Sequence, residues 1–173
     1  METMRYSQEE TLQHCENIQI NHSINISTCI FSIGEAYISE GGSLDFNKPN
    51  PIINLDCVER ILVEKHNRHG KETMDIMFIV YNNSKKNIVI ADFKVNTLPN
   101  SKLQSIKKST IENKISNSES TFSFGIPLIE KKYLIFRKEA VNAAISKINR
   151  QHYNKKHNIV STDIITFYNL FFA

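Results

Sequence analysis

Two adjacent apolar runs, at residues 76–81 and 87–95, constrain this chain more than any other feature. A short polar segment separates them, and each run has the length of a strand. Because side chains alternate between the faces of a strand, Asp92 and Lys94 point to one face and Phe93 points to the other. The pattern therefore predicts a hairpin in which one face changes from apolar to charged near the end of the second strand.

An acid and a base on this face are unusual for a protein core. Asp92 follows Ile88 and Ile90 on the same side of the strand. Its charge is expected to be costly there unless another group compensates it. The arrangement suits a site that holds a metal ion beside a phosphate. The alternative is an exposed Asp–Lys ion pair, which contributes little to stability.

The hydrophobic patterns of the remaining segments predict an α/β domain with a mixed central β-sheet flanked by helices. Helices are expected over residues 6–19, 26–40, 101–115 and 138–151, and strands over residues 57–66, 73–81, 87–95 and 132–137. The first three strands are expected to form an antiparallel meander. A length of 173 residues suits one domain. Its parts are expected to be an N-terminal helix in residues 1–25, a core at about 26–150 and an apolar tail at 151–173 that docks on the core.

Charge is distributed unevenly along the chain. Residues 1–80 carry 12 acidic and 6 basic side chains, whereas residues 81–173 carry 6 acidic and 15 basic ones. A basic half suits a polyanionic partner. The lysines expected to contact nucleic acid are Lys85, Lys86, Lys107, Lys108, Lys131 and Lys132. Alternatively, these lysines only solvate turns and helix faces.

The sequence also bears on compartment. No stretch approaches the roughly 20 apolar residues that a membrane span needs, and residues 1–16 lack a signal-peptide pattern. The three cysteines, Cys15, Cys29 and Cys57, are expected to be structural thiols in a reducing compartment. We therefore expect a cytoplasmic site of action and no membrane partner.

The order helix, three strands, helix, strand, helix resembles the PD-(D/E)xK nuclease superfamily, which has the restriction-endonuclease-like fold (α-β-β-β-α-β). In that fold an acid lies at the start of the second strand and an acid-x-lysine triplet lies in the third. Asp75, in T-M-D-I-M-F, and Asp92 with Lys94, in A-D-F-K-V, fit these positions. The superfamily often adds a glutamate from the first helix, for which Glu35 fits best and Glu40 is the reserve.

The resemblance covers roughly residues 26–150 and departs from the motif in two places. Met74 precedes Asp75 where the superfamily often has proline. The triplet begins with aspartate, which is one methylene shorter than the more frequent glutamate.

The resemblance implies a site for Mg²⁺ or Mn²⁺. The metal ligands would be Asp75, Asp92, the backbone carbonyl of Phe93 and Glu35. Lys94 would orient the attacking water or stabilise charge on the phosphate. Polar residues at the start of the following helix often support such sites, and those of this chain are Gln104, Lys107 and Lys108.

These expectations lead to a metal-dependent nuclease acting on DNA or RNA. Its setting would be a toxin-type domain of a bacterial competition system, which would have a cognate inhibitor protein, or a restriction or repair nuclease. The alternative is a non-catalytic interaction module, such as an immunity protein that binds a toxin through acidic residues 1–80. Convergence of Asp75, Asp92 and Lys94 on one cleft would favour the enzyme. The sequence predicts no oligomeric state.

Overall fold

The computed structural model describes residues 4–43, 46, 49–96, 106–151 and 157–173. In chain order its elements are β1 (Arg5–Tyr6), α1 (Gln8–His22), the 3-10 helix η1 (Ser27–Cys29), β2 (Ile30–Ser32), α2 (Ile33–Ser39), β3 (Pro51–Asn54), α3 (Leu55–His66), β4 (Ile76–Asn82), β5 (Lys85–Phe93), α4 (Lys108–Phe122), β6 (Lys131–Phe136), the 3-10 helix η3 (Lys138–Ala140), α5 (Val141–Arg150), β7 (Asn158–Asp163) and α6 (Ile164–Phe171).

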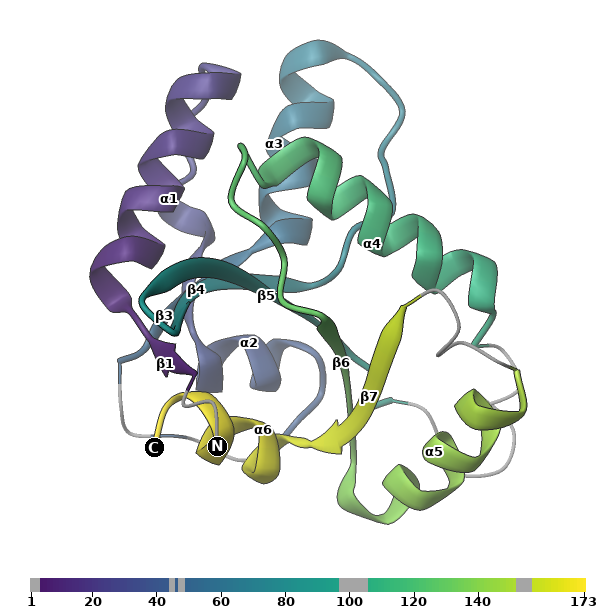
Figure 1. The fold of residues 1–173 in the computed structure, drawn as a ribbon. Helices are drawn as coiled ribbons and strands as arrows, with labels where there is room; N and C mark the ends of the chain where they lie inside the picture. The colour runs from purple at the N-terminus through teal and green to yellow at the C-terminus, as the bar shows by residue number, and fades with distance from the viewer. Residues whose placement is uncertain (1–3, 44–45, 47–48, 97–105, 152–156) are drawn as a thin grey trace.

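The strands form one seven-stranded mixed sheet in the order β2-β3-β4-β5-β6-β7, with β1 pairing with β4. Strands β2 to β5 pair antiparallel, whereas β5–β6 and β6–β7 pair in parallel. Helix α4 makes the crossover between β5 and β6, and α5 makes the crossover between β6 and β7. The predicted α/β class, with a mixed sheet flanked by helices, is confirmed (Figure 1).

The predicted hairpin is formed by β4 and β5. Its turn is centred on Asn83 and Ser84, whose positive φ values of 48° and 63° match the right-handed twist of the flanking strands. Ile76 faces Ala91 at the other end of the hairpin. The side of each strand alternates as predicted, so successive residues contribute to different cores.

A separate hydrophobic core covers each face of the sheet. Helices α1, α3, α4 and α5 bury their apolar side chains against one face. Helices α2 and α6 cover the other, as Figure 1 shows with α1, α3 and α4 above the sheet and α2 and α6 below it. On this second face Phe78 makes edge contacts with Phe167 and Phe171 of α6. The apolar C-terminal segment is thus packed against the sheet.

The strand predicted at residues 57–66 is wrong, because these residues lie in α3. The Asn54 side chain caps this helix by accepting a 2.8 Å hydrogen bond from the Cys57 amide. Val58 and Leu62 are four residues apart and both are buried, which satisfies a helical period. The first strand of the meander is instead the short β3.

Two other predicted helices differ in extent. Only Ile33–Ser39 of the segment 26–40 is α-helical, and it follows a short strand. Helix α4 begins at Lys108, whereas residues 101–105 of the predicted helix lie outside the described residues. Within the described ranges, no helix combines the length and apolar character needed to cross a membrane.

The cysteine prediction is wrong for two of the three residues. Cys29 and Cys57 form a disulfide with a Cα–Cα separation of 5.4 Å, which joins η1 to the first turn of α3. Cys15 is free and buried in α1.

The cap of α3 can be tested by substitution. Asn54→Ala should lower the free energy of unfolding by about 1 kcal/mol, because it leaves a helix N-terminal amide without its acceptor. Chemical denaturation measures the change. Asn21→Ala is the control, since Asn21 makes an exposed bond on the surface of α1 and its loss should cost less than about 0.5 kcal/mol. Equal effects of the two substitutions would contradict the capping role.

Candidate functional site

Asp75 and Asp92 lie opposite each other at one end of the β4–β5 hairpin. Asp75 immediately precedes β4, and the pairing of Ile76 with Ala91 places the two acids in the next register position. The Asp75 amide donates to the Ala91 carbonyl at 3.0 Å, and the Phe93 amide donates to Asp75 Oδ2 at 2.5 Å. The hairpin therefore fixes both carboxylates beside each other.

Two lysines accompany the buried Asp92 carboxylate, whose side chain is 0% exposed. The Lys94 ammonium forms an ion pair with Asp92 Oδ2. The Lys114 ammonium lies 2.8 Å from Asp92 Oδ1 and 3.8 Å from Asp75 Oδ1. A fully buried carboxylate needs such partners, because an isolated charge in the interior is costly. Asp92 and Lys94 thus share one face as predicted, and Lys114 of α4 completes the cluster.

The placement of Lys114 depends on a hydrogen-bond relay through α4. The fully buried Ser118 hydroxyl accepts from the Met74 amide at 2.9 Å and donates to the Lys114 carbonyl at 2.7 Å. This relay joins the helix to the residue before Asp75. It therefore keeps Lys114 over the end of the hairpin.

Three carboxylates lie within reach of a single cation. One carboxylate oxygen each of Glu40, Asp56 and Asp75 lies within 4.8 Å of the others. Glu40 ends α2 and Asp56 lies in the first turn of α3. The Leu55 amide donates to the Asp75 carbonyl at 2.8 Å, which fixes the start of α3 against Asp75. We call Glu40, Asp56 and Asp75 the acidic triad.

The acidic triad borders a surface pocket of about 380 Å³. Glu40 and Asp56 line this pocket directly, and the guanidinium-bearing Arg60 lines it as well. The complete lining is Phe31, Ser39, Glu40, Asn54, Asp56, Cys57 and Arg60. The volume falls within the range of small-ligand pockets. The pocket therefore places one cationic side chain, Arg60, beside two of the three acids of the triad.

Burial and neighbouring charges perturb these carboxyl groups in different directions. Burial, with the nearby charge of Asp92, raises the pKa of Asp75 to about 9. Burial also raises the pKa of Glu40 and the pKa of Asp56, whose carboxyl is enclosed although the residue retains exposed surface. For Asp92, burial opposes ionisation, but Lys94 and Lys114 outweigh it and hold the pKa below its ordinary value.

The donor set of the acidic triad fits a hard divalent cation. Mg²⁺ and Mn²⁺ prefer oxygen ligands, and Mg²⁺ usually combines one or two carboxylates with water. The triad offers carboxylate oxygens from three separate elements, two of which open to the pocket. Burial is the main cause of the raised pKa values in the triad, so a bound cation would favour the ionised form of its carboxyl groups.

The structure separates Glu35 from the acidic triad. Glu35 forms a capping box at the start of α2, in which its carboxylate accepts from the Ser32 amide at 2.7 Å. The reserve residue Glu40 occupies the position that sequence analysis gave to Glu35. The Phe93 amide donates to Asp75 Oδ2, and the expected role of the Phe93 carbonyl as a metal ligand stays a prediction.

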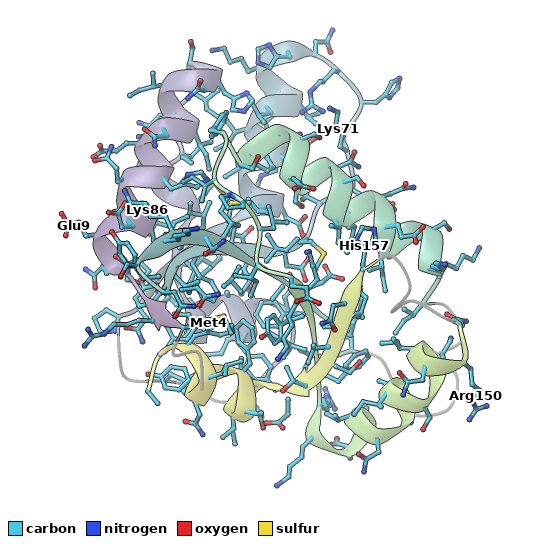
Figure 2. All side chains as sticks on the ribbon, viewed as in Figure 1. Met4, Glu9, Lys71, Lys86, Arg150 and His157 are labelled. Atoms are coloured by element: carbon cyan, nitrogen blue, oxygen red, sulfur yellow. A yellow bond between two sulfur atoms is a disulfide. The ribbon has the colours of Figure 1, made fainter. Side chains whose placement is uncertain are left out.

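The lysines expected to bind nucleic acid do not gather at the site. Lys85 and Lys86 begin β5, roughly 20 Å along the strand from Asp92. Lys86 pairs with Glu10 of α1 at 2.6 Å and lies beside α1 (Figure 2). Lys132 donates to the backbone carbonyls of residues 129 and 130.

The other three lysines of this predicted set stand at the starts of α4 and β6. Lys107 precedes α4, and Lys108 forms a pair with Glu112 at 3.8 Å. Lys131 is exposed at the start of β6. Gln104 lies outside the described residues.

Sequence analysis missed Asp56 and Lys114. Asp56 was placed just before a predicted strand, so its position in the first turn of a helix was not recognised. Lys114 occupies the buried stripe of α4 together with Ile111, Ile115 and Ser118. A lysine within an apolar stripe at helical spacing is the signal that could have indicated a buried acid partner.

No protein-family model, curated protein or solved structure matches this chain closely enough to relate it to a known family.

The two central acids should differ in their effect on stability without metal. Asp92→Asn should destabilise the protein by about 3 kcal/mol or more, because it leaves the buried ammonium groups of Lys94 and Lys114 without their carboxylate. Asp75→Asn should preserve or raise stability at pH 8, since it removes a carboxyl whose ionised form is disfavoured. Thermal and chemical unfolding in EDTA measures both effects. From its apolar neighbours alone, the Asp92 charge was expected to lower stability. With Lys94 and Lys114 in place, removing that charge should lower stability instead.

The pH profile provides an independent check. The unfolded chain loses the Asp75 proton near pH 4, whereas the folded protein keeps it up to about pH 9. The unfolded state then binds fewer protons, so stability should fall as the pH rises between these values, by at most about 1.4 kcal/mol per pH unit. Asp75→Asn should flatten this slope. An unchanged slope in Asp75→Asn would show that Asp75 ionises normally.

Proposed function

We propose that this protein is a metal-dependent nuclease that hydrolyses phosphodiester bonds in DNA or RNA. The observation that carries the proposal is the convergence of Asp75, Asp92 and Lys94 at one end of the β4–β5 hairpin. Glu40 and Asp56 lie beside Asp75 and open to a pocket. The biological setting we propose is a toxin-type domain or a restriction or repair nuclease.

The order of elements supports a restriction-endonuclease-like core. Helix α2 precedes the antiparallel strands β3, β4 and β5, and α4 leads to β6, which is parallel to β5. Two further features support this proposal: an acid directly precedes β4, and an acid-x-lysine triplet lies at the end of β5, with its lysine just after the strand. Helix α3 is an insertion between β3 and β4, and it supplies Asp56.

The acidic triad would hold Mg²⁺ or Mn²⁺. When bound, such an ion lowers the pKa of a coordinated water and polarises a phosphate oxygen. Lys94 would stabilise the negative charge that develops on the phosphoryl group. Arg60 lines the same pocket as Glu40 and Asp56 and would bind a phosphate oxygen of the substrate strand.

A second candidate is a non-catalytic interaction module, which one specific observation favours. Both carboxylate oxygens of Asp92 are already engaged by lysines, so the cluster is compensated without a metal ion. A purely structural ion network would have this arrangement. It would bind no divalent ion at the triad, and the two functions therefore differ in a measurable property.

The nuclease is tested by incubating the protein with supercoiled plasmid DNA and with total RNA in Mg²⁺, Mn²⁺ or EDTA. We expect cleavage of at least one substrate in Mg²⁺ or Mn²⁺ and none in EDTA. Glu40→Gln and Asp75→Asn should each lower the rate by about a hundredfold or more, because each removes a charged ligand from the site.

Glu35→Gln is the matched control. Glutamine can replace glutamate in a capping box, so this variant should retain its fold and nearly all its activity. If Mg²⁺ and Mn²⁺ neither support cleavage nor raise the melting temperature of the wild type, the structural network is the correct interpretation.

The role of Lys94 can be separated from simple substrate binding. Lys94→Ala should reduce kcat by about a hundredfold with little change in KM, because the proposed contact strengthens only as charge develops on the phosphoryl group. Single-turnover kinetics on a labelled oligonucleotide measures both constants. A parallel loss of kcat and affinity would show that Lys94 is only a phosphate contact in the ground state.

A further inference from the structure

A second pocket, of about 390 Å³, lies at the carboxyl ends of the parallel strands β5, β6 and β7. We call it the strand-end pocket. Its lining is Tyr37, Gly41, Gly42, Ser43, Val95, Phe136, Arg137, Lys138, Glu139, Asp163, Ile164 and Ile165. Ligands of open α/β sheets bind preferentially at this edge, in crevices outside the carboxyl ends of the strands.

The strand-end pocket adjoins the candidate site through two chain connections. Gly41 lines the pocket and directly follows Glu40 of the acidic triad. Val95 lines the pocket and directly follows Lys94. Adjacent Cα atoms are about 3.8 Å apart, so a strand bound at Glu40 and Lys94 needs to extend by only a short distance to enter this pocket.

Two glycines, Gly41 and Gly42, follow Glu40 and have little room for a side chain. Gly41 has a φ of 93°, and a Cβ at Gly42 would approach the Tyr37 ring to 2.2 Å. A side chain at Gly42 would therefore displace the Tyr37 ring, which forms part of the pocket lining. Glycine at these two positions therefore allows the chain to turn after α2 while Tyr37 keeps its place in the pocket lining.

The strand-end pocket presents two cationic side chains, Arg137 and Lys138, on its exposed side. Arg137 and Lys138 are exposed, and within the described part of the chain neither forms an ion pair. The Asp163 carboxylate is instead committed to the N-terminus of α6, where it accepts from two backbone amides at 3.0 Å. Glu139 and Asp163 balance the formal charge of the two cations. Because the Asp163 carboxylate faces the positive end of the α6 dipole, part of its charge is offset, and Arg137 and Lys138 are the lining groups that suit an anion.

We propose that the strand-end pocket binds a backbone phosphate of the nucleotide that flanks the scissile bond, through Arg137 and Lys138. The identity of the ligand as a nucleic-acid strand rests on the proposed nuclease function. The acidic triad and the strand-end pocket then lie along one path, with the Glu40–Gly41 junction between them. A planar guanidinium and a flexible ammonium are both common phosphate ligands.

The test measures binding without cleavage. Fluorescence anisotropy follows fluorescein-labelled ten-nucleotide oligothymidylate and oligouridylate, with EDTA or with Ca²⁺, at several salt concentrations. The double variant Arg137→Ala/Lys138→Ala should bind the better of the two probes about tenfold or more weakly than the wild type. Its dependence of log affinity on log salt should be shallower by about 0.7 units, because one neutralised phosphate of a single strand is lost.

Lys71→Ala/Arg150→Ala is the control, because it also removes one lysine and one arginine from exposed positions outside both pockets (Figure 2). It should retain wild-type affinity to within about twofold, and circular dichroism should show that both double variants are folded. Equal affinities for all three proteins, equal losses in both double variants, or no binding of either probe by the wild type would each overturn the proposal.

Cleavage of plasmid DNA and RNA by the wild type, measured in parallel, separates this proposal from the proposed function. Binding that depends on Arg137 and Lys138 without any metal-dependent cleavage would retain the pocket and reject the nuclease. Cleavage together with binding that is insensitive to both residues would retain the nuclease and reject the pocket.

Discussion

The burial of the Asp92 carboxylate within the sheet is the constraint on which the site depends. A charge that is 0% exposed needs cations close by, and two elements supply them. Lys94 directly follows the strand that carries Asp92, two residues later in the chain. Lys114 comes from α4, so this crossover helix must lie over the end of the hairpin. The helix that connects β5 to β6 thus also supplies a cation that balances the charge of Asp92.

The same compensation has a chemical consequence for a metal ion. Lys114 lies 2.8 Å from Asp92 and 3.8 Å from Asp75, between the two central acids. A divalent ion at the acidic triad would add positive charge beside an ammonium that already serves this purpose. Within the triad, a cation would therefore bind mainly through Glu40 and Asp56, which line the pocket.

Local alternation of side chains was sufficient to predict the central hairpin, whereas the proximity of Asp75 to Asp92 was expected only from the resemblance to a nuclease core. These strands are apolar on both faces and are interrupted by a polar turn, so only a register centred near Asn83 buries both faces. Residues 57–66 were assigned to a strand because a short run rich in branched residues satisfies either period. The side-chain cap from Asn54 decides in favour of the helix, and it depends on a backbone geometry that sequence alone did not indicate.

The rest of the site could not be derived from local patterns because it depends on long-range packing. Glu35 and Glu40 belong to the same segment. Which of them faces Asp75 depends on where the short helix α2 begins and ends, and the sequence pattern did not show this. Asp56 meets Asp75 only through the bond between the Leu55 amide and the Asp75 carbonyl. Lys114 reaches Asp92 across 22 residues of chain. Pattern analysis could indicate that an acid pair exists, but not which distant residues surround it.

The Cys29–Cys57 disulfide closes a covalent ring with a sequence separation of 28 residues. This ring contains all of α2, the two glycines and β3, and it carries Glu40 and Asp56, whereas Asp75, Asp92 and Lys114 lie outside it. Closing a loop of this length removes conformational entropy from the unfolded chain that is worth about 3 to 4 kcal/mol in the loop-entropy model. The two halves of the acid cluster are therefore ordered by different means. Asp75, Asp92 and Lys114 are held by sheet and helix packing. Glu40 and Asp56 also gain order from the disulfide, which only oxidising surroundings maintain. The redox state of the medium therefore determines how well these two acids are ordered before a ligand binds.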